Sequence, residues 1–338
     1  MIDFFEFFST GLYGDSGQGA VEVELVLNGD YLDFLNVPYL GEFEEGITEE
    51  IALTKLEAII AGHHRVMDAL RKFASKPNKK ITYLIGNHDA ELFFEKVRER
   101  ITRLWDPEGQ YPSEKVRVVA DVDRLDYGNG LEIRHGNQFE VSNQLDFEHP
   151  FLELPNGKKV LHIPWGSIYV LKIINRLKWE RSNIDKIRPI KLFAVFGMIF
   201  DPVFTARYLS LSLFYFLKTR ILGRAKKKFG FSHTVKMVSQ EGTLSQDLEK
   251  EAKELLDSAP DVHTVVFGHT HLPMHRVYAN GRQYLNSGTW TKMVYLDWRF
   301  MGDPIRKTFI LIHLKNGEIK AELNQWVGQK MPYQAYLG

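Results

Sequence analysis

Four short apolar segments of the chain each end abruptly in a turn that contains glycine and a polar side chain. The first, VELVLNGDYLDF at 23–34, stops at Asn28-Gly29-Asp30. An apolar run with β-branched residues is typical of a strand buried on both faces, in a sheet covered by helices. The other three end in GNHD at 86–89, RHG at 134–136 and GHTH at 268–271. Alone, each ending predicts only a strand followed by a turn, because Asn, Gly and Asp are common turn residues.

Segments with helical spacing separate these predicted strands. Thr48 is a suitable N-cap, and apolar residues from Leu56 to Phe73 then recur on a single helical stripe that includes His63 as a structural residue. We expect further helices over 91–105 and 245–259, and strands over 115–140, 282–290 and 306–319. Strands that alternate with helices in this way predict an α/β protein.

The composition is that of a globular protein with a substantial core. Of the 338 residues, 44% are apolar and 25% are charged, and Lys+Arg and Asp+Glu both number 43. This balance provides no global field that would favour nucleic acid or another polyanion. The chain contains no cysteine, which excludes disulfides and thiolate metal sites. Any metal must be held by His, Asp, Glu or Asn, a donor set that suits Mn, Mg, Fe or Zn.

Neither the first twenty residues nor the most apolar segment of the chain indicates export or membrane insertion. The first twenty residues lack the basic region and the small-residue cleavage site of a signal peptide. The most membrane-like segment, 192–217, is interrupted by Asp201, Pro202 and Arg207. No run of about 18 uncharged residues remains, so we favour a segment that does not span the membrane.

The four strand endings together suggest a metal site. Because the carboxyl ends of parallel strands meet at one edge of a sheet, we expect their polar side chains to converge there. The converging residues are Asp30, Asn87, His88, His135, His269 and His271. Polar groups crowded in this way would be left unsatisfied without a cation. The sequence therefore predicts a divalent metal centre with oxygen and imidazole ligands.

The order and content of these turns resemble the calcineurin-like metallophosphoesterase family. Its pattern runs Asp-x-His, Gly-Asp-x-x-Asp, Gly-Asn-His-Asp/Glu, a lone His, and Gly-His-x-His. The chain matches the last four elements in order, with the first of them ending at Asp33 and the lone His at His135. The resemblance covers 23–290, and it implies the family's four-layer αββα sandwich.

The resemblance also assigns metal ligands. It implies that Asp30 bridges two metal ions held about 3.5 to 4 Å apart, with a metal-bound hydroxide as the nucleophile. Asn87, His135 and His269 would complete the protein ligands of one metal, and His271 would bind the other.

Two further residues receive catalytic roles by resemblance. His88 corresponds to the family's outer-sphere histidine, which stabilises phosphoryl oxygens or protonates the leaving oxygen. Asp89 is expected to orient the imidazole of His88, as carboxylates often do. We expect Asp33 to support the site or the fold rather than to bind metal.

The first family element, Asp-x-His, has no match. Neither Asp3 nor Asp15 has His two positions on, so only Asp30 and His271 remain for the second metal. This is too few for a firm site. We favour an N-terminally incomplete chain, because the remaining motifs are intact. The alternative is a single-metal or degenerate member of the family.

The segment 150–230 is rich in aromatic, aliphatic and basic residues and predicts a helical cap inserted in the core formed by 1–149 and 231–338. It resembles the lid of the UDP-2,3-diacylglucosamine pyrophosphohydrolase branch, although that branch usually has Arg where this chain has His88. An apolar groove and a basic patch would suit a lipid-linked phosphate; the residues are Phe193, Phe196, Phe200, Phe204, Phe214, Phe216, Arg220, Arg224, Lys226, Lys227 and Lys228. The alternative is that the aromatic residues form the cap's own core and the lysines a solvated face.

These observations predict a metal-dependent hydrolase of phosphoester or pyrophosphate bonds that uses two divalent ions, on a phosphorylated small-molecule or lipid substrate. We expect a cytoplasmic protein with peripheral membrane contact through 192–228. The alternative from another class is a non-catalytic metal-binding protein that uses the cap for membrane or partner binding. A nuclease is disfavoured by the neutral charge balance and by the lack of a long basic stripe.

Overall fold

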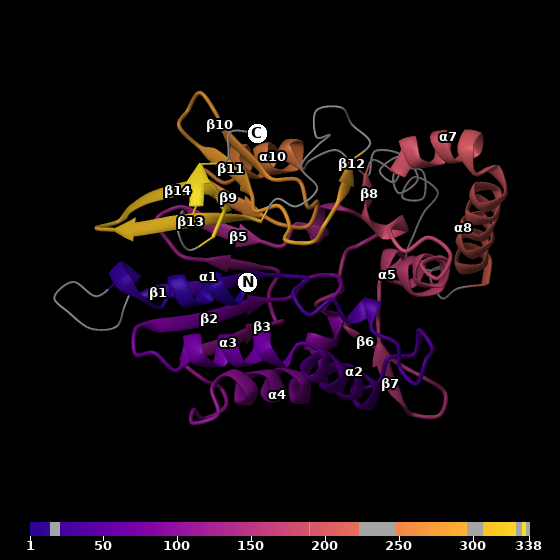
Figure 1. The fold of residues 1–338 in the computed structure, drawn as a ribbon, viewed down its shortest axis with the longest axis horizontal. Helices are drawn as coiled ribbons and strands as arrows, with labels where there is room; N and C mark the ends of the chain where they lie inside the picture. Colours follow the sequence, from indigo (N-terminus) through magenta and orange to yellow (C-terminus); the bar gives the residue numbers. More distant parts are fainter. Residues whose placement is uncertain (14–20, 189, 223–247, 296–306, 329–332, 336–338) are drawn as a thin grey trace.

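The chain folds into a mixed α/β structure of sheets and helices, shown by a computed structural model (Figure 1). The structure describes residues 1–13, 21–188, 190–222, 248–295, 307–328 and 333–335. Two sheets lie against each other, and a group of helices extends from one end of them.

The first sheet is parallel, with the order β1-β2-β3. Its strands are β1 (Val23–Asn28), β2 (Lys79–Leu84) and β3 (Val116–Val119). Parallel neighbours need crossover connections, which α2 (Glu49–Gly62), α3 (His64–Ala74) and α4 (Glu95–Trp105) provide. These helices lie on the side of the sheet that faces away from the second sheet (Figure 1).

The helix predicted between the first two strands is in fact two helices. Thr48 caps α2 as expected, because its side chain accepts a hydrogen bond from the backbone N–H of Ile51 at 3.4 Å. The chain then breaks at His63, whose φ of −124° and ψ of 27° are not helical. The single apolar stripe therefore continues across a break that side-chain periodicity does not reveal.

The second sheet has the order β10-β11-β9-β5-β4. Its strands are β4 (Arg124–Asp126), β5 (Leu131–Arg134), β9 (Thr264–Phe267), β10 (Met274–Val277) and β11 (Gln283–Asn286). The central strands β5, β9 and β11 are parallel, so their carboxyl ends reach one edge together. The helix α10 (Glu249–Ser258) packs its Ala252 and Leu256 against this sheet.

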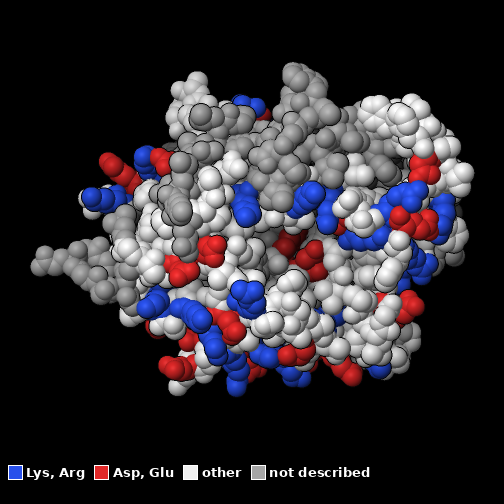
Figure 2. Space-filling model, in the orientation of Figure 1, with Lys and Arg blue, Asp and Glu red and all other residues white. Residues whose placement is uncertain are grey.

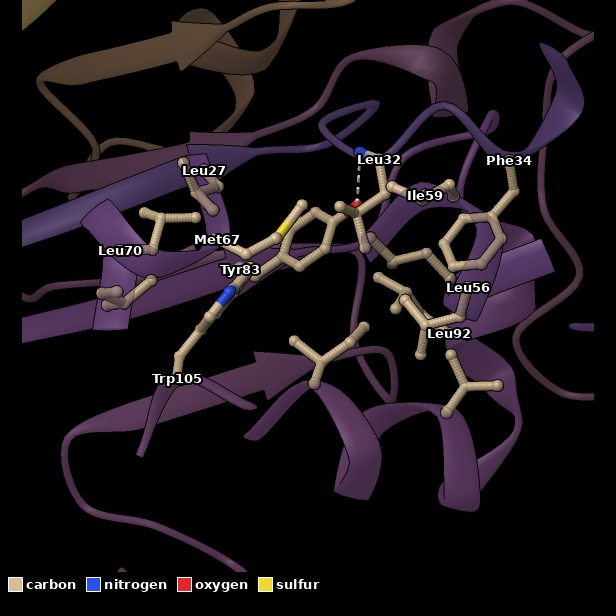
Figure 3. Close-up of a cluster of buried hydrophobic side chains, with 14 of the residues drawn as sticks. Leu27, Leu32, Phe34, Leu56, Ile59, Met67, Leu70, Tyr83, Leu92 and Trp105 are labelled. Atoms are coloured by element: carbon tan, nitrogen blue, oxygen red, sulfur yellow. Dashed lines mark hydrogen bonds between the residues drawn. The ribbon is translucent and has the colours of Figure 1, made fainter. Parts of the chain in front are cut away.

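Two apolar clusters hold these layers together. The larger one lies between the first sheet and its helices, where Tyr83 is fully buried and its hydroxyl accepts a hydrogen bond from the backbone N–H of Leu32 at 3.2 Å (Figure 3). The second lies between the two sheets and includes Leu84, Ile133 and Val266. Alternate residues of β9 therefore face opposite layers, as strand geometry requires.

A third, antiparallel sheet consists of β13 (Thr308–Lys315), β14 (Glu318–Trp326) and β15 (Tyr333–Ala335). The turn between β13 and β14 is Asn316-Gly317, and both residues have positive φ, at 52° and 83°. Paired positive φ angles are typical of a two-residue hairpin turn, and the predicted strand over 306–319 therefore ends in this turn. Ala321 and Leu323 of β14 extend the core between the sheets.

The segment predicted as a helical cap contains strands as well as helices. Its elements are β6 (Phe151–Glu153), β7 (Lys159–Leu161), α5 (Trp165–Tyr169), a π-helix (Val170–Ile174), α6 (Asn175–Leu177), β8 (Ile187–Arg188), α7 (Ile190–Phe200) and α8 (Pro202–Leu222). The strand β8 pairs with β12 (Val294–Tyr295), and α1 (Ile2–Phe7) begins the chain. The purely helical expectation was wrong at 151–161 and at 187–188, where the chain forms strands.

The aromatic residues predicted for a groove divide between two environments. Phe204 is buried in a local core with Leu177 and Tyr208. Phe200 and Phe214, in contrast, are 81% and 58% exposed. The side chains of Phe193, Phe216 and Arg220, and all of Arg224 and 226–228, lie outside the described residues. Over the part of the chain that the structure describes, no helix combines the length and apolar character needed to cross a bilayer.

The strand β1 departs from expectation in its burial. The sequence predicts burial on both faces, as the structure shows for β9, where every residue is buried. In β1 only Leu27 is buried, and Leu25 and Val26 are partly exposed. Among the described residues, β1 is therefore less buried than its apolar sequence predicts.

Candidate metal centre

Asp30 lies two residues after the end of β1 in an unusual backbone conformation. Gly29 and Asp30 have φ angles of 76° and 54°, and such positive values are uncommon for a residue with a side chain. The Asp30 carboxylate is held on one side and faces an imidazole on the other: Oδ1 accepts a hydrogen bond from the backbone N–H of His88 at 2.8 Å, and Oδ2 lies 3.1 Å from Nε2 of His135. The turn after β1 therefore aims one carboxylate at the ends of two other segments.

Two glycines make this approach possible. A Cβ atom on Gly29 would lie 2.2 Å from Nδ1 of His135, and a Cβ on Gly86 would lie 2.2 Å from Oδ1 of Asp30. Neither contact is sterically allowed. The glycines of the two turns are thus required by the close approach of site residues as well as by the turn itself.

His135 follows β5 and is 2% exposed. Its Nδ1–H donates a hydrogen bond to the carbonyl oxygen of Asn28 at 2.7 Å. Because a carbonyl can only accept, Nδ1 carries the proton, and Nε2 is left to face Asp30. Although Nε2 lies close to the carboxylate, it has no partner with hydrogen-bond geometry among the described residues.

His269 follows β9 and is held by a carboxylate that sequence reasoning missed. Its Nε2 lies 2.8 Å from Oε2 of Glu140, and this oxygen also accepts a hydrogen bond from Nδ2 of Asn143 at 2.7 Å. Its other ring nitrogen, Nδ1, is buried and has no hydrogen-bond partner within the described chain. A carboxylate behind a histidine in this way is the usual support for a metal ligand.

The two histidines are also joined through their backbones. The N–H groups of Gly268 and His269 donate to the carbonyl oxygen of His135 at 2.9 and 3.0 Å. The imidazole centroids lie 5.2 Å apart with an interplanar angle of 68°. The parallel pairing of β5 with β9 therefore brings together residues that are far apart in sequence.

Asn87 lies in the turn after β2, between Gly86 and His88, whose backbones approach Asp30. It is 2% exposed, and its Oδ1 has no hydrogen-bond partner in the described residues. Buried polar atoms are nearly always hydrogen-bonded, so this oxygen and the two unpartnered ring nitrogens need a common explanation. One ligand atom each from Asp30, His135 and His269 lie within 4.8 Å of one another. These donors fit a divalent cation of the kind that N/O ligands bind.

His271 does not join this cluster. It lines the same cavity as Asp30 and has a positive φ of 62°, but the set of mutually close ligand atoms does not include it. Within the described residues, the structure therefore brings together three of the four donors predicted for one metal, Asp30, His135 and His269. The second metal stays a prediction.

The electrostatics of the centre follow from burial and from facing charges. Burial alone would raise the pKa of Asp30, but the imidazoles of His135 and His88 outweigh it and hold that pKa well below its usual range. Burial lowers the pKa of His135, and the charge of Asp30 more than compensates, so the pKa is raised. The site thus favours a carboxylate among cationic or metal-bound groups.

His88 is positioned by Asp33 rather than by Asp89. Its Nδ1 lies 2.7 Å from Oδ1 of Asp33. Burial lowers the pKa of His88, but the charges of Asp30 and Asp33 outweigh it and raise the pKa to about 9. At neutral pH the imidazole is therefore cationic, with Nε2 on the side of the ring opposite Asp33.

Asp89 instead holds the loop that carries Asp33. Its Oδ2 and Oδ1 accept hydrogen bonds from the backbone N–H groups of Tyr31 and Asp33, each at 3.0 Å, and Tyr83 donates from its hydroxyl. Burial, and then the charge of Asp30, raise the pKa of Asp89 to about 8. The expectation that Asp89 contacts the imidazole was wrong, because its carboxylate is used by the backbone of the neighbouring turn.

Glu140 and Asn143 could not be identified from strand endings. They lie in the turn that follows His135, at 137–143, rather than directly at the end of a strand. Their only signal is the presence of a carboxylate and an amide a few residues after a predicted ligand. Side-chain support of this kind depends on the path of the loop, which spacing does not fix.

The comparisons with known proteins add little to this geometry. No protein-family model and no curated protein matches the chain. Among solved structures, the chain is similar to Vps29 from Entamoeba histolytica, crystallised in complex with zinc. The two are 21% identical over 25% of this chain and 44% of that chain, with a TM-score of 0.19. The chain thus spans less than half of that relative, and a likeness at this TM-score supports no conclusion about fold or function.

Proposed function

We propose that this chain is a metal-dependent hydrolase of phosphoester or pyrophosphate bonds with the calcineurin-like four-layer fold. In this proposal 1–149 and 231–338 form the core, and 150–230 is an insertion beside the site. The observation that carries the proposal is the convergence of one ligand atom each from Asp30, His135 and His269 to within 4.8 Å of one another. The buried Oδ1 of Asn87, which has no hydrogen-bond partner among the described residues, is the fourth donor of the proposal.

The residues of the cluster would hold one divalent cation, such as Mn, Mg, Fe or Zn. A bound cation of this type polarises a phosphoryl oxygen and lowers the pKa of water. The protein's part is to keep the donors in place: Asn28 and Glu140 fix the tautomers of the two imidazoles, and the N–H of His88 fixes the carboxylate. A second cation would use Asp30 and His271.

His88 would act on the substrate rather than on the metal. Its protonated imidazole is held by Asp33, so Nε2–H is available to donate to a phosphoryl or leaving oxygen. Charged hydrogen-bond donors aimed at a developing negative charge contribute strongly to catalysis in partly buried sites. This role matches general-acid chemistry near neutral pH, where the raised pKa keeps the proton on the ring.

The insertion suggests the class of substrate. Exposed apolar side chains gather on α7 and α8: Val195, Phe196, Met198, Ile199, Phe200, Val203, Leu209, Leu213, Phe214 and Leu217. Such a surface suits a lipid-linked phosphate or peripheral membrane contact through 192–228. Figure 2 shows basic and acidic side chains interspersed over the visible face, which gives no support to a nucleic-acid substrate.

Metal content and turnover test the proposal. The purified chain, loaded with Mn²⁺, should hydrolyse an aryl phosphodiester or a nucleoside diphosphate ester. His135→Ala should abolish both tight metal binding and activity, whereas His64→Ala, at an exposed position on α3, should leave both unchanged. Metal binding without turnover in the wild-type chain would favour a non-catalytic binding protein. Equal losses in the two variants would contradict the assigned site.

A further inference from the structure

The contact between His88 and Asp33 is only partly shielded from water. Nδ1 of His88 lies 2.7 Å from Oδ1 of Asp33, and the Asp33 side chain is 44% exposed. An ion pair as exposed as this contributes little by itself, because water competes for both partners and the side chains lose freedom when they pair. Asp33 therefore needs a further contact to keep the imidazole in one orientation.

The other oxygen of the Asp33 carboxylate has such a contact. Oδ2 accepts a hydrogen bond from Nδ2 of Asn36 at 2.5 Å, and Oδ1 of Asn36 accepts one from Nζ of Lys178. The amide must be oriented in this way, because an ammonium can only donate and a carboxylate can only accept. Nζ of Lys178 also lies 2.8 Å from Oδ2 of Asp185. A chain of hydrogen bonds thus runs from the imidazole of His88 to the insertion, 150–230.

The backbone that follows Asp33 is held by the same part of the insertion. The 3₁₀ helix η2 (Phe34–Asn36) begins directly after Asp33. Phe34 and Leu35 are fully buried, and Figure 3 shows Phe34 among the apolar side chains that pack against the first sheet. The carbonyl oxygen of Leu35 accepts a hydrogen bond at 2.8 Å from Nδ2 of Asn175, a buried residue of α6. The turn between Asp33 and the insertion is therefore fixed by both its backbone and its side chains.

Asn175 and Lys178 contact η2 from one face of a helix. Lys178 follows α6 directly and keeps helical angles, with φ of −57° and ψ of −30°. Residues three positions apart lie on the same side of a helix, so the amide and the ammonium point in the same direction. The π-helix Val170–Ile174 precedes them, and turns of this type are frequent at functional sites.

We propose that Lys178 of the insertion is a positioning residue for His88. It acts through Asn36 and Asp33, and Asn175 holds the backbone between them. This role rests on the proposed function of His88 and adds to it a dependence on the insertion. A movement of α6 is transmitted along the chain of hydrogen bonds to the imidazole, so the insertion sets the orientation of the proton donor.

Lys172 provides a matched control on the same stretch of helix. Its Nζ donates a hydrogen bond to the carbonyl oxygen of Phe43 at 2.7 Å and lies 3.7 Å from Oε1 of Glu45. Like Lys178, it is a cation of the insertion that contacts the segment after β1. Lys172→Met therefore removes a comparable contact while the hydrogen bonds that lead to His88 stay in place.

Exchange of the Nδ1 proton of His88 with water, measured by NMR on the metal-free chain, tests the positioning directly. This proton is held by Asp33 in the wild type. Lys178→Met and Asn36→Ala should each speed its exchange at least about tenfold. Lys178→Arg, which keeps a cationic donor, and Lys172→Met should match the wild type. Asn36→Ala interrupts the same chain at a second point, so the test does not depend on the folding of one variant.

Turnover by the Mn²⁺-loaded chain provides the second readout. Lys178→Met should lower kcat about 10- to 100-fold, because a displaced catalytic group is ineffective, while KM and metal affinity stay close to those of the wild type. In a His88→Ala background the same substitution should have no further effect, because its effect passes through that imidazole. A substitution that only loosened the fold would lower kcat in both backgrounds.

Three results would overturn the positioning role. They are unchanged exchange of the His88 proton in Lys178→Met, equal effects of Lys178→Met and Lys172→Met, and a further loss of kcat from Lys178→Met in the His88→Ala background. Exchange is measured without metal and without substrate, so its outcome is independent of turnover. Faster exchange in Lys178→Met together with an inactive wild-type chain would support the link between Lys178 and His88 and count against the proposed function alone. An active wild-type chain with unchanged exchange in Lys178→Met would refute only the positioning role.

Discussion

Replacement of Gly29 by alanine provides the sharpest test of how the metal centre is built. The substitution has two separable costs. The φ of 76° places the residue in the left-handed region, which costs an L-residue about 1 to 2 kcal/mol. The new methyl carbon would also lie 2.2 Å from Nδ1 and 2.5 Å from Cγ of His135, and overpacking of this kind costs about 1 to 3 kcal/mol.

Gly281→Ala is the matched control for the backbone cost. Gly281 has a φ of 78°, and a Cβ atom there would have no neighbour within 4 Å. We expect Gly29→Ala to lower the free energy of unfolding by about 2 to 5 kcal/mol and Gly281→Ala by about 1 to 2 kcal/mol, measured by urea denaturation. The difference between the two losses in unfolding free energy measures the cost of the contact with the His135 imidazole.

The same pair of variants tests the metal site. The methyl group must push the His135 ring away from the Asn28 carbonyl and from Asp30, so Gly29→Ala should weaken Mn²⁺ binding measured by calorimetry, and Gly281→Ala should not. If the two variants lose equal stability and Gly29→Ala binds metal as the wild type does, the close packing described for this turn is wrong.

Three further predictions concern the buried ion pair between Lys55 and Glu91, the support of His269, and His88, the proposed proton donor. Nζ of Lys55 lies 2.5 Å from Oε1 of the buried Glu91, so Lys55→Met would leave that carboxylate without its cation and should lower the free energy of unfolding by about 3 to 5 kcal/mol in urea titrations. Replacing both residues by apolar ones should recover most of the loss. Glu140→Gln should weaken metal binding about 10- to 100-fold, measured by calorimetry, with little change in the fold. Unchanged affinity would show that Glu140 does not support the metal ligand His269. His88→Ala should lower kcat about 10²- to 10⁴-fold while metal affinity stays close to that of the wild type, and equal effects from His64→Ala would refute the assignment.

Strand endings were the part of the site that the sequence could predict. Asp30, His135 and His269 converge because each lies within two residues of the end of a strand, and parallel pairing then places the ends of β5 and β9 beside each other. Glycine next to a potential ligand was a reliable sign, since a side chain at Gly29 or Gly86 would collide with the site. These features are local, and local features are visible in sequence.

The remaining features depend on tertiary contacts. Asp33 and Asp89 are equally plausible partners for His88 by spacing, and only the path of the loop decides that Asp33 makes the contact while Asp89 accepts backbone N–H groups. The helix break at His63 leaves the apolar periodicity intact, so it has no sequence signature. The partial exposure of β1 depends on which strands flank it, and a single strand's composition does not contain that information.

The shared acceptor at the His135 carbonyl has a consequence for metal uptake. Because the amides of Gly268 and His269 both donate to that oxygen, the backbone of the sheet fixes the spacing of the two imidazoles before any ion binds. Loading should therefore resemble the filling of a rigid cage, with little ordering entropy to overcome. Discrimination between ions would then depend on ionic radius and coordination geometry, since the donors have little freedom to adapt.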